Sequence, residues 1–201
     1  MYAIGVDTAA GVQVVGVDTD YSDIKVIDAK TRRHVATLRT RDLPERVGEF
    51  ACAIGQLYNW ALLGIERNSY GGTTLNRALE LAYPNIYYDT SSSKPVAGWW
   101  TSAESRQEML RGLREHVLLH QLSTQDTEFV MEMGAFTWVK VKETGENMWK
   151  VQARGGHDDA IIAMSIALAV APRAAPLKLA QQVEPRRWDE PSTTSAMPWM
   201  R

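Results

Sequence analysis

Short apolar runs separated by polar turn residues open the chain, a pattern typical of β-strands. The run from Tyr2 to Asp7 ends in an acid and is followed by Thr8-Ala-Ala-Gly11, which predicts a buried strand and then a turn. Further β-type runs lie at Val12 to Val17, Ile24 to Asp28 and His34 to Thr40, with turn formers between them. Together these runs predict an antiparallel meander.

The spacing of apolar residues then changes to that of a helix. Asp42-Leu-Pro-Glu45 matches a capping box, and apolar residues recur at helical spacing from Val47 to Tyr58. The run from Ala61 to Glu66 is another short strand that ends in an acid, and it leads into a predicted helix that ends near Ala82 and a short strand from Asn85 to Tyr88. Alternating strands and helices indicate parallel crossovers, so the meander should continue into a parallel part of one mixed sheet.

The second half of the chain predicts further helices and a β-hairpin. A capping box at Thr101 to Glu104 starts a helix with one apolar face, and a second helical piece covers Asp126 to Met133. The runs from Phe136 to Lys142 and from Met148 to Gln152 flank a glycine-containing loop, which predicts a hairpin. The stretch from Ala160 to Ala171 is apolar on almost every side, so this last helix should be buried.

Composition sets the domain organisation. A chain of 201 residues with 45% hydrophobic residues is long enough to form one globular core. Five of the eight prolines lie in the last 30 residues, where no apolar period is visible. We therefore expect one α/β domain over residues 1–171, with helices flanking a mixed sheet, and a flexible tail over residues 172–201.

Charge and cysteine content remove several classes of protein. The 22 basic and 24 acidic side chains give a net charge of -2, so the bulk charge does not indicate a nucleic-acid partner. Cys52 is the one cysteine in the sequence and cannot form an internal disulfide. The sequence has no signal-peptide pattern and no run of 18 apolar residues, so we expect an intracellular protein that does not span a membrane.

Acidic residues stand where predicted strands end and where the last helix begins. Asp7 and Glu66 each follow a strand, and Asp158 and Asp159 start the last helix. Carboxyl ends of strands and adjacent helix N-termini meet at one edge of an open α/β sheet. Carboxylates gathered there repel one another, and Mg²⁺ or Mn²⁺ relieves this repulsion by binding their oxygens. Two such ions about 4 Å apart can activate water and stabilise the leaving oxygen in phosphodiester hydrolysis.

Each acid also has a structural explanation when it is taken alone. Asp7 could be a turn residue, and Glu66 could form an ordinary ion pair with Arg67. Asp158 and Asp159 could simply cap the last helix. The combination of all four favours a cation site over these separate explanations.

Four groups of short motifs follow one another along about residues 3 to 170. They are Gly5-Val-Asp7-Thr-Ala with Asp20-Tyr-Ser, Ile65-Glu-Arg-Asn68 with Gly71, Gly98-Trp-Trp-Thr101, and Gly156-His-Asp-Asp159-Ala-Ile-Ile-Ala163. In this order they resemble the nuclease domain of the large terminase subunit of tailed bacteriophages. The most specific part of the resemblance is Ile-Glu-Arg-Asn together with His-Asp-Asp-Ala.

The resemblance implies an RNase H-like fold and an enzyme that uses two Mg²⁺ or Mn²⁺ ions to cut concatemeric viral DNA during genome packaging. By position it implies Asp7, Glu66 and one or both of Asp158 and Asp159 as metal ligands. It further implies double-stranded DNA as substrate, and the terminase ATPase motor, the small terminase subunit and the portal as partners in the cytoplasm of an infected bacterial host. No Gly-x-x-x-x-Gly-Lys-Ser/Thr loop occurs in the chain, so the motor would lie outside it. The nuclease would then be an excised domain or a separately encoded subunit.

Further residues near these motifs are candidates for supporting roles. Arg67 could hold a carboxylate or a phosphate, with Asn68 beside it. His157 could shuttle a proton or ligate a metal, or it could be an ordinary histidine of a surface loop. Asp20 matches a position of the resemblance, and its alternative is a turn residue.

The predicted hairpin carries four basic residues that could contact DNA phosphates. These are Lys140, Lys142, Lys150 and Arg154. Alternate residues of a strand share a face, as Lys140 and Lys142 do. The alternative is a solvated strand face balanced by neighbouring glutamates.

The leading hypothesis is therefore a Mg²⁺- or Mn²⁺-dependent endodeoxyribonuclease with a mixed sheet and an added hairpin. An actin-like or sugar-kinase-type ATPase shares the strand, acid and turn at the start, but it should carry more glycine-rich phosphate loops. A non-catalytic docking module for a packaging partner is the third class, in which the carboxylates are structural.

Overall fold

The computed structural model describes residues 1–12, 19–143, 146–153 and 157–176. A four-stranded mixed sheet forms its centre, in the order β3-β2-β1-β4. The strands are β1 (Tyr2–Asp7), β2 (Ser22–Asp28), β3 (His34–Thr40) and β4 (Leu62–Ile65). β1, β2 and β3 pair antiparallel, and β4 pairs parallel with β1, which confirms the predicted meander followed by a parallel crossover. Apart from Val12, the strand predicted at Val12 to Val17 lies outside the described part.

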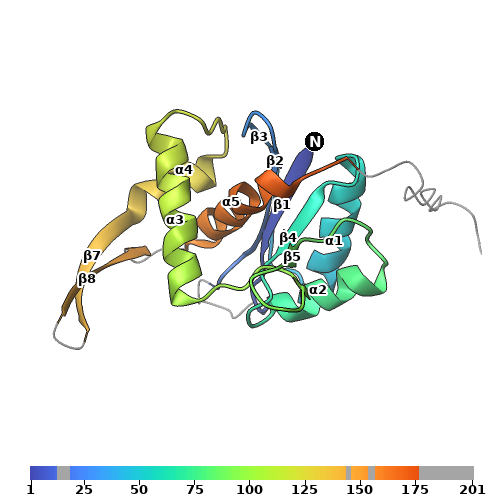
Figure 1. Ribbon diagram of the computed structural model, residues 1–201, viewed down its shortest axis with the longest axis horizontal. Coiled ribbons are helices and arrows are strands. Elements are labelled where there is room, and N and C mark those ends of the chain that lie inside the picture. The colour runs from blue at the N-terminus through green and yellow to red at the C-terminus, as the bar shows by residue number, and fades with distance from the viewer. Residues whose placement is uncertain (13–18, 144–145, 154–156, 177–201) are drawn as a thin grey trace, which may run out of the picture.

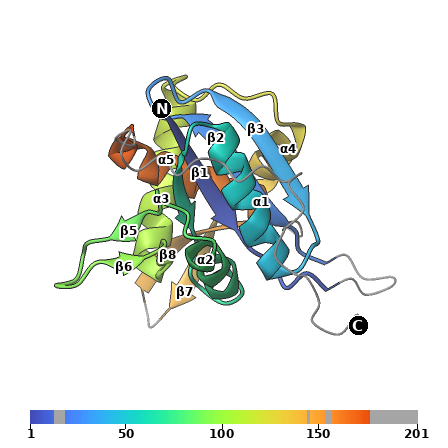
Figure 2. The same cartoon turned by 90° about the vertical axis from the view of Figure 1, so that its right-hand side faces the viewer.

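Two helices cover one face of the sheet (Figures 1 and 2). They are α1 (Pro44–Leu57) and α2 (Gly71–Glu80). They pack on apolar side chains that alternate along the strands, such as Ile4 and Val6 of β1 and Leu63 of β4. This packing follows from the period-two pattern of the strands and the helical period that succeeds it.

The opposite face carries α5 (Asp159–Val170), with α3 (Ala103–Leu118) and α4 (Thr127–Ala135) packed around it (Figure 1). α5 is buried along almost its whole length, as its uniform apolarity predicts. Gly5 of β1 lets it approach, because a Cβ there would lie 2.0 Å from the Ala163 carbonyl oxygen. α5 therefore lies directly against the central strand, and its N-terminus is fixed relative to the end of β1.

Three smaller elements complete the fold. β5 (Tyr88–Asp89) pairs with β6 (Val96–Ala97), and Ile86 forms a single parallel bridge to Leu63 of β4. The strand predicted from Asn85 is thus reduced to that bridge and the short β5. β7 (Phe136–Glu143) and β8 (Glu146–Ala153) form the predicted hairpin, which begins where α4 ends and projects from the body of the molecule (Figure 1).

Two predicted helix caps are wrong in detail, although both helices exist. α1 is capped at Leu43 without a side-chain hydrogen bond, because Asp42 bonds Thr40 and Pro44 opens the helix. α3 does begin with a capping box, but its partners are Ser102 and Ser105, one residue beyond the predicted pair.

The C-terminal end of the described chain is a short 3₁₀ helix, Ala171–Arg173. Residues 177–201 lie outside the described part, so the division into a domain over residues 1–171 and a flexible tail stays a prediction. Among the helices that are described, none has the length and apolarity needed to cross a bilayer.

Candidate active site

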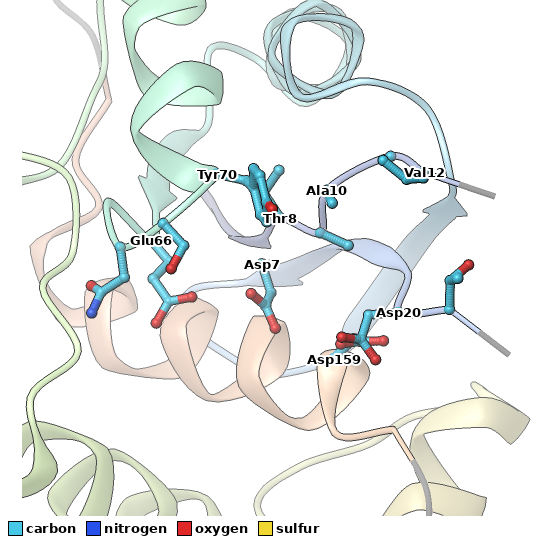
Figure 3. A pocket seen from close by; sticks show the side chains of 13 residues that line it. Asp7, Thr8, Ala10, Val12, Asp20, Glu66, Tyr70 and Asp159 are labelled. Atoms are coloured by element: carbon cyan, nitrogen blue, oxygen red, sulfur yellow. The ribbon is translucent and has the colours of Figure 1, made fainter. Parts of the chain in front are cut away.

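Three chain segments bring acids together at one edge of the sheet. Asp7 is the last residue of β1, and Glu66 follows β4, where its N–H donates to the Val6 carbonyl at 3.0 Å. Asp159 is the first residue of α5. Figure 3 shows Asp7 between Glu66 on one side and Asp159 with Asp20 on the other. The convergence expected from strand ends and a helix N-terminus is therefore present.

These acids line a cavity of about 530 Å³. Its wall is formed by the turn after β1, the segment before β2, the β4–α2 connection and the start of α5. The lining residues are Asp7, Thr8, Ala9, Ala10, Gly11, Val12, Thr19, Asp20, Glu66, Asn68, Ser69, Tyr70 and Asp159.

The position of Asp7 is unfavourable for a negative charge. Burial raises the pKa of the Asp7 carboxyl well above its ordinary value, and the neighbouring Glu66 carboxylate raises it further. Asp159 and Asp158 add smaller effects of the same sign. A bound divalent cation would reduce the repulsion between this carboxyl and the neighbouring acids.

Asp159 is held by the segment that leads into β2. Its Oδ2 accepts a hydrogen bond from the Tyr21 N–H at 3.0 Å and lies 3.8 Å from the Arg39 guanidinium. Burial nevertheless raises the pKa of Asp159 to about 6, and Asp20 contributes in the same direction. Burial thus opposes a charge on Asp159 as it does on Asp7, but only at Asp159 do Tyr21 and Arg39 offset part of the effect.

Asp158 has a different environment from Asp159. It occupies the N-cap position of α5 but makes no side-chain capping bond, and its carboxylate pairs with Arg106 of α3. It does not belong to the cavity lining, although it is close enough to affect the pKa of Asp7. The two adjacent acids therefore face different partners.

His157 and Asp20 lie beside Asp159. The His157 Nδ1 atom is 3.1 Å from Asp20 Oδ1 and 3.7 Å from Asp159 Oδ2. One potential ligand atom from each of the three residues lies within 4.8 Å of the others, a spacing that suits a metal ion. Both supporting candidates are thus adjacent to the acid at the start of α5.

Arg67 and Asn68 follow Glu66 in the connection between β4 and α2. Among the described residues the ion-pair partner of Arg67 is Asp89, at 3.6 Å, and its guanidinium lies over the Trp100 ring. The Asn68 side chain donates to the Thr101 carbonyl and accepts from the Thr101 N–H. Asn68 therefore lines the cavity and also fixes the loop that carries the Gly-Trp-Trp-Thr motif.

Comparison with known proteins identifies the fold. No family model matches the sequence, and no curated protein matches it. Among solved structures, the large terminase nuclease from the thermophilic phage G20c matches with a TM-score of 0.61 and 16% identity, over 84% of this chain and 81% of that one. The chain has the large terminase nuclease fold.

Two further structures give the same result. The magnesium-bound form of the phage G20c nuclease has a TM-score of 0.62 and 19% identity, over 84% of this chain and 80% of that one. The large terminase nuclease domain of Thermus phage P74-26 has a TM-score of 0.59 and 18% identity, over 85% of this chain and 79% of that one. The resemblance seen in the sequence motifs is confirmed at the level of the fold, which is the RNase H-like arrangement that it implied.

The hairpin of this terminase-like fold carries the basic residues that were candidate phosphate contacts. Register pairs Lys140 with Trp149, Lys142 with Asn147 and Lys150 with Val139. Arg154 lies outside the described part of the chain, and the side chains of the three lysines are likewise not described. Their contact with DNA stays a prediction.

Sequence reasoning missed two residues that support the site, Arg39 and Glu132. The Glu132 carboxylate of α4 accepts hydrogen bonds from the Ala160 and Ile161 N–H groups of α5. Arg39 Nη1 bonds the other oxygen of Glu132 at 2.8 Å. The available signal was that Glu132 is the one charged residue between Phe129 and Ala135, where an isolated acid in an apolar run indicates a buried partner.

Proposed function

We propose that this chain is a divalent-cation-dependent DNA endonuclease that cuts concatemeric viral DNA during genome packaging. The observation that carries the proposal is the meeting of Asp7, Glu66 and Asp159 in one cavity at the edge of the sheet. The likeness to large terminase nucleases of phages G20c and P74-26 supports it.

The donor set suits a hard divalent cation such as Mg²⁺ or Mn²⁺, because it consists of carboxylate oxygens. Asp7, Glu66 and Asp159 would hold the cations, with Asp158 as a further ligand from the start of α5. The raised pKa of Asp7 fits this assignment, since its nearest charged neighbours are other acids. Structures of the phage G20c nuclease contain bound magnesium, cobalt or zinc, which supports divalent binding by this fold.

When bound, two such cations supply positive charge that activates a water and stabilises the leaving oxygen of a phosphodiester. The residues of the chain provide the rest. Asp7, at the end of the central strand β1, would fix where the cations bind. Glu66 and Asp159 lie on opposite sides of the Asp7 carboxylate. His157, whose Nδ1 is 3.1 Å from Asp20, can hold or pass on a proton at the rim of the cavity.

The partners follow from the same proposal. The substrate is double-stranded DNA, and the ATPase motor, the small terminase subunit and the portal assemble with the nuclease in the cytoplasm of the host bacterium. A net charge of -2 means that the chain itself offers little electrostatic attraction to DNA. Most of the affinity for DNA would then come from these partners, while the bound cations would neutralise the negative charge of the carboxylates in the site.

Supercoiled plasmid incubated with Mn²⁺ tests the proposal. The wild-type chain should nick the plasmid with Mn²⁺ and lose that activity in EDTA. Asp7→Asn should reduce nicking by about 100-fold or more, as loss of a central ligand does. Asp28→Asn is the matched control, because Asp28 lies at the opposite end of the β1–β2 pair, is only partly buried, and accepts hydrogen bonds from the N–H groups of the following turn.

Equal nicking by wild type and Asp7→Asn would contradict this assignment of the site. No nicking by wild type under any divalent cation would favour the non-catalytic docking module.

A further inference from the structure

The start of α5 is capped by another helix instead of by its own N-cap residue. An aspartate at the N-cap position ordinarily accepts hydrogen bonds from the second or third N–H group of its helix. In α5 these donors are the N–H groups of Ala160 and Ile161, and both donate to Oε2 of Glu132, at 2.9 and 3.2 Å. Asp158, at the N-cap, makes no such bond.

Glu132 is built into this position. It is 7% exposed, and its second oxygen, Oε1, accepts from Arg39 Nη1 at 2.8 Å. Both oxygens are thus used, one on the helix end and one on the guanidinium. The Arg39 guanidinium also lies 3.8 Å from Asp159 Oδ2, so it pairs with both the capping carboxylate of Glu132 and the first acid of α5.

The cap has a consequence for the two acids beside it. A carboxylate cannot cap a helix and point away from it at the same time. Glu132 occupies the donors of Ala160 and Ile161, while the Asp158 carboxylate pairs with Arg106 and Asp159 lines the cavity. An N-cap aspartate is the usual acceptor for those N–H groups, so Asp158 is the expected substitute when Glu132 is removed.

We propose that Glu132 is a positioning residue: by capping α5 from α4, it keeps the Asp158 carboxylate off the helix end and leaves the Asp159 carboxylate facing the cavity, available to divalent cations. This inference rests on the cation site of the proposed function. Glu132 itself touches neither the cations nor the DNA.

Mn²⁺ binding to the full chain tests the inference, with the loss of the free-ion EPR signal as the readout. Glu132→Ala should weaken Mn²⁺ binding by about tenfold or more, as loss of a residue that orients metal ligands does. Glu132→Gln should weaken binding less than Glu132→Ala, because its amide oxygen still accepts from both N–H groups although its NH2 group cannot accept from Arg39. Glu128→Ala is the matched control, since Glu128 lies one turn earlier on α4 and is exposed. If Glu132→Ala does not fold, Glu132→Asp replaces it, because the shorter acid keeps its charge near Arg39 but withdraws from the helix end.

A second measurement on the metal-free protein tests the cap directly. In the Glu132→Ala background Asp158 should take over the capping, so Asp158→Ala should lower Tm more there than it does in the wild-type background. Equal Mn²⁺ affinity of wild type and Glu132→Ala would overturn the inference and leave the proposed function standing. Absence of Mn²⁺ binding by wild type would contradict the proposed function instead. In that case additive effects of the two substitutions on Tm would overturn the capping role as well.

Discussion

Asp7 is a residue at which the stability of the metal-free fold and the proposed function oppose each other. It lies at the end of the central strand, partly buried, with Glu66 and Asp159 on its two sides. Burial and these neighbours raise its pKa, so an ionised Asp7 destabilises the metal-free fold. Because its charge lowers the stability of the metal-free protein, Asp7 is better explained by the proposed cation site than by a role in stability.

Asp7→Asn should therefore stabilise the metal-free protein at neutral pH. The folded state raises the pKa of Asp7 above the ordinary value of 3.8, so below that pH both states hold the proton and the residue costs nothing. As pH rises, the unfolded chain releases its proton first and the folded state loses stability until the pH passes the folded-state pKa. We expect Asp7→Asn to raise Tm by on the order of 2–4 °C near neutral pH in EDTA, and not to change it in acid.

Calorimetry at several pH values measures this effect, and Asp28→Asn supplies a control of opposite sign. Hydrogen bonds from the Thr31 and Lys30 N–H groups lower the pKa of Asp28, so its replacement should cost stability at neutral pH and not in acid. A lower Tm of Asp7→Asn at neutral pH would mean that the Asp7 charge stabilises the metal-free protein, contrary to its surroundings.

At the scale of elements, the connection between β4 and α2 places Glu66. The chain turns so tightly there that a Cβ on Gly71 would lie 1.8 Å from the Glu66 carbonyl oxygen. A Cβ on Gly72 would meet its nearest atom, the Arg67 carbonyl oxygen, at 3.6 Å, which is an ordinary contact. A methyl group at Gly71 would therefore displace the Glu66 backbone, whereas one at Gly72 would not displace its neighbours.

Gly71→Ala should lower the free energy of unfolding by about 1–3 kcal/mol, because the turn must open to admit the methyl group. It should also reduce Mn²⁺-dependent nicking, since the displaced backbone carries Glu66. Gly72→Ala should leave both quantities close to wild type. Urea unfolding and the plasmid assay measure the two effects, and equal behaviour of the two variants would show that the turn does not position Glu66.

Much of the element order could be predicted from the sequence, because the apolar period changes from two to that of a helix at the correct places. The helix caps were less predictable, since Thr101, Ser102, Glu104 and Ser105 offer overlapping capping pairs and local sequence does not choose between them. The strand predicted from Asn85 shrank to one bridge and the short β5, because so short a run has little apolar surface to bury. Element types were thus predictable and their ends were not.

The candidate site was predictable for a related reason. Asp7, Glu66 and Asp159 each end or begin an element, and the topology of an open sheet brings such positions to one edge. Arg39 and Glu132 could not be assigned in the same way. Their contact joins β3 to α4 across more than 90 residues of chain, and no local pattern encodes that pairing.

At the scale of the whole molecule, a buried ionic network ties the sheet to the α4 side of the fold. Lys25 of β2 is fully buried, and its Nζ contacts Asp23 at 2.8 Å and Asp126 at 2.6 Å. Arg39 continues the network from Asp23 to Glu132. The network therefore reaches from the centre of the sheet to the residue that caps α5.

Lys25→Met should cost about 3–5 kcal/mol of unfolding free energy, because it leaves buried carboxylates without their cation. Burial opposes ionisation of Asp126, but the bonds from Lys25 and Thr37 lower its pKa, so the variant should be least impaired in acid, where that carboxyl can be protonated. Lys30→Met, at the turn after β2, is the exposed control. Urea unfolding at neutral and acid pH measures the effect, and a loss below about 1 kcal/mol would show that the network contributes little to stability.

The net charge of -2 describes the whole chain but not its site. Four acids line the cavity where phosphate would lie under the proposed function, and bound cations would be needed to offset their repulsion of DNA. Cation binding and DNA cleavage are therefore linked in this account, and the location of the cations is its central claim.

Anomalous diffraction from a crystal of the full chain grown with Mn²⁺ tests that claim most directly. We expect anomalous peaks beside the Asp7 carboxylate, within bonding distance of Glu66 and Asp159 oxygens, and their loss in Asp7→Asn. Peaks elsewhere on the molecule, with none at Asp7, would contradict it.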